Sequence, residues 1–195
     1  MQKTREYRTQ QILQAAAKCF ARDGYSGASM DDIVNAAGLS KGGLYWHFKS
    51  KQALLVALCQ AWWEIVREGM AKAAREDQSA GDRLRALFLA VGRGSAAHPE
   101  LARIHAEGLF IGGRAPEVMA CQRAIYDELH AYISQTLTYG ISRGEFRPQP
   151  VETIASHILA ALDGAVVQRP ILIGHVREPL QWNVIANSIL ILLQP

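Results

Sequence analysis

The sequence predicts an all-α protein of about nine helices, with a three-helix helix-turn-helix domain over residues 1–50 and a second helical domain over residues 51–195. Three observations favour this fold class. Apolar residues recur every three or four positions along most of the chain. Serine, glycine and proline stand where helices begin and end. Two short helical segments joined by a glycine-containing turn follow the first amphipathic segment.

The first helix is expected from about Thr9 to Phe20, because Ile12, Ala16 and Phe20 share one face, and it should stop at Asp23-Gly24. A second, two-turn helix should begin after Ser29. Ser29 can cap it together with Asp32, which stands three residues later in a weak form of the capping box. Gly38 should end this helix.

Ser40 is expected to cap a third short helix, in which Leu44 and Phe48 face the core. The opposite face then carries Lys41, Gly42, Gly43, Tyr45 and Trp46. In a helix-turn-helix, this face of the second motif helix enters the DNA major groove. The alternative is that Tyr45 and Trp46 are core aromatics and that Lys49 and Lys51 are solvated.

The residue types on this face suit nucleic-acid binding, and Ser40, at the start of the helix, is also a candidate for contact with DNA. Lys41 can donate to guanine or to a phosphate, and Gly42 and Gly43 let the backbone approach the duplex closely. Tyr45 and His47 suit phosphate hydrogen bonds, and Lys51, at the start of the next helix, can bind another phosphate. Residues 1–51 hold eight basic and four acidic residues, whereas the remainder holds 13 basic and 14 acidic residues. This asymmetry favours a polyanion-binding N-terminal domain, although a solvated surface explains so small an excess equally well.

The signature of the TetR family of transcriptional regulators resembles residues 24–55, GYSGASMDDIVNAAGLSKGGLYWHFKSKQALL. The resemblance implies an all-helical homodimer that binds double-stranded DNA at a palindromic operator, usually represses transcription, and releases the operator when a small-molecule effector binds. It also implies DNA contacts at matching positions, which are Ser29, Lys41, Gly42, Tyr45, His47 and Lys51. One position departs from the pattern: Asp31 stands where a base-reading basic residue can occur. Asp31 can accept a hydrogen bond from cytosine or simply cap its helix.

The second domain should contain six more helices. Glycines and prolines interrupt the chain at Gly112-Gly113, Gly144, Pro148 and Pro150. Pro170 should kink its helix or end it early, and the β-branched run around Val166 has no partner strand. The expected ranges are 50–75, 82–95, 99–110, 116–143, 151–173 and about 180–193.

The last two helices are apolar over more than one stripe. This breadth favours a four-helix dimer interface built from two copies of the pair, and a monomer core is the alternative. The effector is expected between the connecting helix and the middle helices, in a mostly apolar cavity with a few polar anchors. For each candidate residue, the alternative is a purely structural role. If Asp163 is buried and faces the cavity, a cationic or hydrogen-bond-donating effector is favoured. The candidates are Trp62, Trp63, Phe88, His105, Phe110, Gln122, Tyr126 and Asp163.

Several other functions are disfavoured. The sequence lacks the glycine-rich, nucleophile and metalloprotease motifs of enzymes, and His98 and His105 lack an acidic partner for a metal site, so we expect no catalytic residue, cofactor or metal. The neutral second domain disfavours an architectural DNA-binding protein, whereas a ligand-dependent activator stays open. Cys19, Cys59 and Cys121 are predicted to be reduced and buried. The N-terminus has no apolar signal and no apolar run reaches the ~20 residues of a membrane span, so we expect a cytoplasmic protein.

Overall fold

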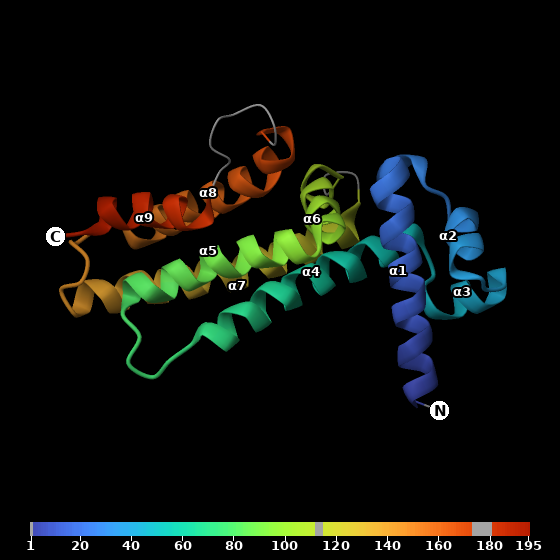
Figure 1. The fold of residues 1–195 in the computed structure, drawn as a ribbon, viewed down its shortest axis with the longest axis horizontal. Helices are drawn as coiled ribbons and strands as arrows, with labels where there is room; N and C mark the ends of the chain where they lie inside the picture. The colour runs from blue at the N-terminus through green and yellow to red at the C-terminus, as the bar shows by residue number, and fades with distance from the viewer. Residues whose placement is uncertain (1, 112–114, 173–180) are drawn as a thin grey trace. The chain divides into compact units, whose positions relative to one another are not determined.

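The structure is a computed structural model that describes residues 2–111, 115–172 and 181–195. These residues form nine α-helices and no strand, as the sequence predicts (Figure 1). The helices are α1 Gln2–Gly27, α2 Met30–Ala37, α3 Lys41–His47, α4 Lys51–Ala73, α5 Ala80–Ala97, α6 Pro99–Ile111, α7 Pro116–Ser142, α8 Val151–Leu172 and α9 Trp182–Leu193.

The chain forms two compact units. The first contains residues 1–62 and 99–123, and the second contains residues 63–98 and 124–195. The first unit therefore extends past residue 50, where the sequence suggested a boundary, because α6 packs on α1. The assignment of DNA binding to residues 1–50 alone stays a prediction.

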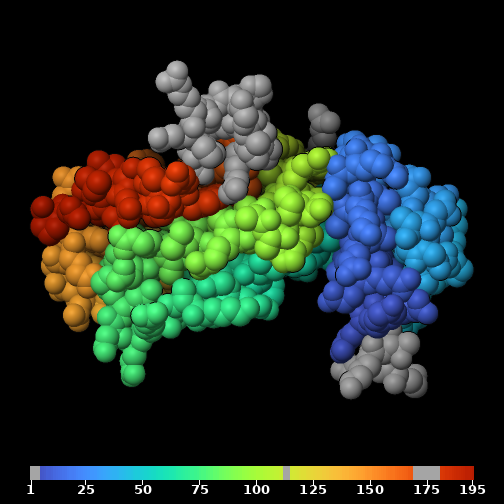
Figure 2. All heavy atoms as spheres, viewed as in Figure 1, coloured from blue at the N-terminus to red at the C-terminus, as the bar shows by residue number. Residues whose placement is uncertain are grey.

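In the first unit, α1, α2 and α3 bury one apolar face each. Ile12 and Phe20 of α1, Ile33 of α2 and Leu44 of α3 are fully buried, as is Leu54 of α4. Burial of side chains of this size stabilises the unit by about 1.5–3 kcal/mol each. Figure 2 shows the outer surface of α1, α2 and α3 in shades of blue.

Caps fix the ends of the two short helices as the sequence predicts. The Ser29 hydroxyl accepts from the Asp32 amide, and the Asp32 carboxylate accepts from the Ser29 amide, which completes a capping box. Gly38 ends α2 in the left-handed conformation, with φ 63°. Ser40 caps α3 by accepting from the Gly43 amide at 3.1 Å.

α1 is longer than expected. Its apolar pattern begins only at Ile12, whereas the helix already begins at Gln2, so its first turns are polar and were outside the expected range. Gly24, at φ 72°, kinks the helix at the expected stop. α6 holds this end of α1: Glu107 accepts from the Tyr25 amide at 2.8 Å, and Arg103 donates to the Ala21 carbonyl.

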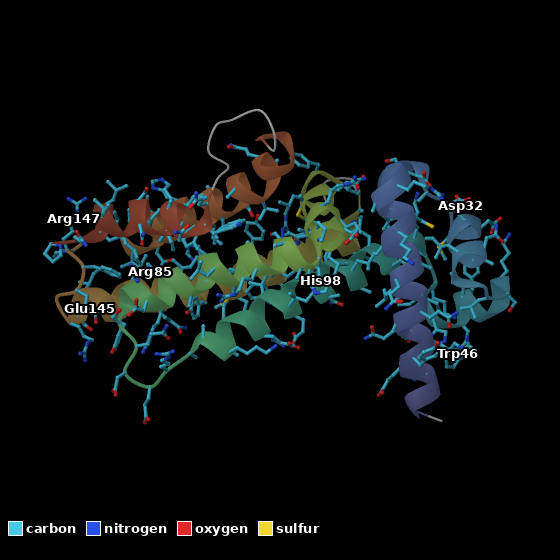
Figure 3. The ribbon with its side chains drawn as sticks, viewed as in Figure 1. Asp32, Trp46, Arg85, His98, Glu145 and Arg147 are labelled. Atoms are coloured by element: carbon cyan, nitrogen blue, oxygen red, sulfur yellow. The ribbon has the colours of Figure 1, made fainter. Side chains whose placement is uncertain are left out.

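In the second unit, α9 lies along α5 (Figure 1). The contact is close at Gly92, where an added Cβ would lie 2.3 Å from the Trp182 ring. At the other end of the unit, Glu145 accepts from the Ala80 amide at 2.6 Å, and the Arg147 amide donates to the Leu193 carbonyl at 3.0 Å (Figure 3). The loop after α7 is thereby tied to both α5 and α9.

The ends of α8 and α3 bear on two expectations from the sequence, one for Pro170 and one for Phe48. α8 continues past Pro170 to Leu172, so the proline does not end the helix early. Phe48 is only partly buried, because α3 ends at His47 and Phe48 is its extended C-cap residue. The break at Gly112-Gly113 and the start of the last helix near Leu180 lie outside the described residues. No described helix combines the length and the apolarity that a membrane crossing needs.

Candidate nucleic-acid interface

Two of the expected DNA-binding residues have structural tasks in the free protein. Ser29 and Ser40 both use their hydroxyls to cap helices, and Ser29 also donates hydrogen bonds to the carboxylate of Asp32. Hydrogen bonds from the side chain and the backbone of Ser29 lower the pKa of Asp32. These caps set the orientation of α2 and α3 and hence of the residues between them.

Lys41 and Asp31 form an ion pair on the exposed face of α2 and α3. The Lys41 Nζ lies 2.9 Å from Oδ1 and 3.0 Å from Oδ2 of Asp31. Both side chains are more than half exposed, at 64% and 62%. The hydrogen bond to Asp31 raises the pKa of Lys41, so the ammonium stays charged. Asp31 does not cap α2, because Ser29 and Asp32 do so.

Gly42 and Gly43 differ in their surroundings. A Cβ added to Gly42 would meet no atom within 4 Å, whereas one added to Gly43 would lie 3.3 Å from the Ser40 hydroxyl. Gly42 therefore presents bare backbone on the exposed side of α3. Gly43 sits against the cap of its own helix.

Tyr45, Trp46 and His47 complete this face. Trp46 is 61% exposed and Tyr45 is 38% exposed, so neither is a core aromatic. The His47 ring packs edge-on against Trp46 and its Nδ1 lies 3.1 Å from the Thr9 hydroxyl. The contact with Thr9 brings the end of α3 next to α1.

Sequence reasoning missed the basic and aromatic residues at the start of α1. The Arg5 guanidinium lies 5.1 Å from the centre of the Trp46 ring, and Arg8 lies 5.9 Å from the ring of Tyr7, which is 66% exposed. A shallow hollow beside them is lined by Arg5, Glu6, Thr9 and Gln10. Arg5, Tyr7 and Arg8 are visible in the sequence, but the first helix was expected to begin only at about Thr9, so the sequence did not place Arg5 beside Trp46 of α3.

Lys51 has partners other than a phosphate. Its ammonium donates to the carbonyls of Tyr25 at 2.7 Å and Ala28 at 2.8 Å, and it lies 4.6 Å from the centre of the Tyr25 ring. The phosphate contact stays a prediction, and a phosphate would have to compete with these carbonyls for the ammonium. Lys51 joins the start of α4 to the end of α1.

The eight effector candidates divide equally between the two units. In the first unit, Trp62, His105 and Gln122 are buried together: the rings of Trp62 and His105 are 6.3 Å apart, and the Gln122 amide nitrogen donates to the His105 carbonyl at 3.4 Å. Burial lowers the pKa of His105 to about 4. His105 Nδ1 and Gln122 Oε1 have no hydrogen-bond partner among the described residues. The fourth candidate here, Phe110, is 76% exposed, so it is not buried with the other three.

In the second unit, the polar candidates are paired within the protein. Trp63 Nε1 donates to Glu128 at 2.7 Å, and the Tyr126 hydroxyl donates to the Asp163 carboxylate. Burial raises the pKa of Asp163. Phe88 is fully buried in α5. Among the described residues, no group of three His, Cys, Asp or Glu side chains is placed to hold a metal ion.

The chain matches two family models. Residues 12–58 match the bacterial regulatory proteins of the tetR family, and residues 80–190 match the C-terminal domain of BetI-type transcriptional repressors. Both models cover helices described above.

Individual proteins agree with these matches. The HTH-type transcriptional regulator YfiR of Bacillus subtilis is 30% identical over 165 residues, which are 83% of this chain and 80% of YfiR. The HTH-type transcriptional activator FasR of Mycolicibacterium smegmatis is 40% identical over 82 residues, which are 42% of this chain and 37% of FasR. A TetR transcriptional regulator from Chloroflexus aurantiacus has a similar structure, with a TM-score of 0.74, 29% identity and coverage of 98% of this chain and 93% of that one. The chain belongs to the TetR family of bacterial regulatory proteins and is a DNA-binding transcriptional regulator.

Proposed function

We propose that this regulator binds a palindromic operator as a homodimer, represses transcription there, and is released when a small-molecule effector binds. The observation that carries the proposal is the exposed face of α3, on which a charged Lys41, a bare Gly42 and an exposed Trp46 lie together. The match to BetI-type repressors supports repression, and the match to FasR keeps activation as the second candidate.

On DNA, the first turn of α3 enters the major groove. Lys41 donates to base edges, Gly42 allows the backbone to approach, and Tyr45 and His47 bind phosphates. Trp46 with Arg5 extends the contact to the backbone beside the groove. The 5.1 Å distance between them supports this, because stacking on the ring holds the guanidinium in place.

The dimer forms through α8 and α9. One face of α9 is buried in its own unit by Trp182, Ala186 and Leu190. Val184, Ile191 and Leu192 are 52–66% exposed on the same helix. An apolar stripe of this kind favours burial against a second copy.

The effector binds at the cluster of Trp62, His105 and Gln122. Two buried polar atoms without partners, His105 Nδ1 and Gln122 Oε1, support this location, because unpaired buried groups are costly and a ligand can satisfy them. α6 carries His105 between Arg103 and Glu107, which hold the end of α1. Binding at His105 shifts the population of α6 positions and with it the presentation of α3.

The regulator acts in the cytoplasm, where its DNA target is, and it needs no catalytic residue, cofactor or metal. A random pool of duplexes, selected with the full-length protein, yields the operator sequence. A reporter whose promoter carries that sequence then separates the two candidates: expression that falls with the regulator supports repression, and expression that rises supports activation. Native mass spectrometry of the protein from cell extract tests the effector, and a bound small molecule lost in His105→Leu supports the assigned site.

A further inference from the structure

The ion pair between Asp31 and Lys41 is placed on the face that meets DNA, although it contributes little to the fold. Both side chains are more than 60% exposed, and an ion pair in that setting adds little stability. Asp31 is also unnecessary as a cap, since Ser29 and Asp32 satisfy the start of α2. Phosphates repel a carboxylate at this position, so a favourable contact with a base is needed to offset the repulsion.

The two groups of the pair match the two halves of one base pair. In the major groove, guanine offers its N7 and O6 as acceptors, and the paired cytosine offers its N4 amino group as a donor beside them. An ammonium held against a carboxylate offers the complementary order, a donor next to an acceptor. The ammonium has three donors and the carboxylate has about four lone-pair sites, so each can bind a base edge while keeping its partner.

Resting on the proposed function, we propose that Asp31 and Lys41 together read a single G·C base pair in each half-site, with Lys41 on guanine and Asp31 on cytosine. The close pairing of the two groups, with the Nζ 2.9 Å and 3.0 Å from the two carboxylate oxygens, carries this assignment. It makes the acidic residue a determinant of specificity. A basic residue alone at this face selects acceptors and leaves the second base unread.

Among the other base pairs, T·A has the major-groove edge most similar to that of G·C, and Asp31 and Lys41 together can distinguish the two. Thymine O4 and adenine N6 also present an acceptor beside a donor. However, the thymine methyl group replaces guanine N7, which removes one acceptor for Lys41. Adenine N7 is a further acceptor next to the carboxylate of Asp31 and repels it. Both differences favour G·C.

The test uses the full-length protein without substitutions, called the parent, and DNA duplexes that the parent selects from a random pool. Each base pair of the selected half-site is replaced in turn, and binding is measured by fluorescence anisotropy. We expect one G·C pair whose replacement by T·A weakens the parent about 10-fold or more. In Asp31→Ala and in Lys41→Ala, this preference falls below about 3-fold at that same base pair, while preferences elsewhere in the half-site are retained.

Asp23→Ala is the matched control, because it also removes one negative charge from the first unit. Asp23 bonds to Arg22 near the end of α1. Both acidic variants are expected to bind shuffled DNA somewhat more tightly, but only Asp31→Ala changes the base preference. Circular dichroism checks that each variant is folded, and Asp31→Asn serves as a second variant that keeps the size of the side chain.

Three results would overturn the inference. If Asp31→Ala keeps the parent's preference at every position, Asp31 only neutralises charge. If Asp31→Ala and Lys41→Ala lose preference at different base pairs, the two residues do not read one pair. Both outcomes leave sequence-specific binding intact, whereas a parent that selects no shared sequence overturns this inference and the proposed function together.

Discussion

At the scale of single residues, Gly42 is a position where a side chain has room in the free protein and, in the proposed complex, would stand between α3 and the duplex. Nothing lies within 4 Å of an added Cβ. Gly42→Ala should therefore leave the free energy of unfolding unchanged or raise it by up to about 1 kcal/mol, because alanine favours the helix. Binding to the selected duplex should weaken about 10-fold, measured by anisotropy.

Gly81→Ala is the control for this substitution. Gly81 also lies in a helix, and its added Cβ would make only ordinary contacts at 3.7 Å and 3.8 Å. It should gain similar stability without any loss of DNA binding. Unchanged DNA binding in Gly42→Ala would show that the backbone of α3 does not approach the duplex there.

His105 should make stability depend on pH. Burial lowers its pKa from 6.5 to about 4 in the folded chain. The unfolded chain therefore binds more protons between these values, and the free energy of unfolding falls as pH drops through this window, by up to about 1.4 kcal/mol per unit. Urea unfolding of the parent and His105→Gln at pH 7 and pH 5 measures the effect.

The variant should lose less stability than the parent on acidification. The lowered pKa values of Asp23 and Asp32 act below their ordinary value of 3.8, outside this window. Equal losses in the parent and the variant between pH 7 and pH 5 would mean that the His105 pKa is not depressed.

Sequence could identify functional residue types but not their partners. Lys41, Gly42 and Trp46 were placed on the exposed face by their spacing alone. The partners of Lys41 and Lys51 lie 10 to 26 residues away, so they depend on how helices pack. The same holds for His105 and Gln122, whose common burial requires α6 and α7 to meet.

At the scale of helices, Lys51 ties α4 to the end of α1. Lys51→Met should lower the free energy of unfolding by about 1–3 kcal/mol, because the Tyr25 and Ala28 carbonyls lose a charged donor. The salt dependence of DNA binding should change little. Urea unfolding and anisotropy at several salt concentrations measure the two effects.

Lys49→Met is the comparison, because Lys49 is exposed and two residues away. It should leave stability within about 0.5 kcal/mol of the parent. A different result would support the phosphate contact that the sequence suggested. The Lys51→Met variant would then be as stable as the parent, and the slope of its log affinity for DNA against log salt concentration would be lower by about one.

The packing of α9 on α5 depends on Gly92. An added Cβ would lie 2.3 Å from the Trp182 ring, so Gly92→Ala must displace that ring. We expect a loss of about 1–3 kcal/mol in the free energy of unfolding, against no loss for Gly81→Ala on the same helix. Thermal unfolding of both variants measures this difference. Equal stability of the two variants would mean that α9 shifts to accommodate the added methyl group at little cost.

Helix ends were more predictable than helix contacts. The caps at Ser29, Gly38 and Ser40 depend on residues at most four positions apart, so the sequence shows them directly. The polar start of α1 has no apolar period and was missed. The bonds from Arg103 and Glu107 to α1 span about 80 residues, and no local pattern reports them.

At the scale of the whole molecule, the fold class could be predicted from the period of the apolar residues and from the serines, glycines and prolines at helix ends. The division into two compact units could not be predicted in this way. α6 belongs with α1 in the first unit, although 71 residues lie between Gly27, where α1 ends, and Pro99, where α6 begins. The first unit thus contains both the exposed face of α3 and the buried cluster around His105. This composition supports the proposed coupling between the effector cluster around His105 and the face of α3, because both lie within one unit.

The central claim is that the face of α3 reads DNA sequence. Its most direct test is the ratio of the affinities for the selected duplex and for a shuffled duplex of equal length, measured by anisotropy near physiological salt. We expect the parent to prefer the selected duplex by about 1,000-fold or more, and Lys41→Ala to lose at least about 5-fold of that ratio. Equal affinities of the parent for the two duplexes would contradict the account.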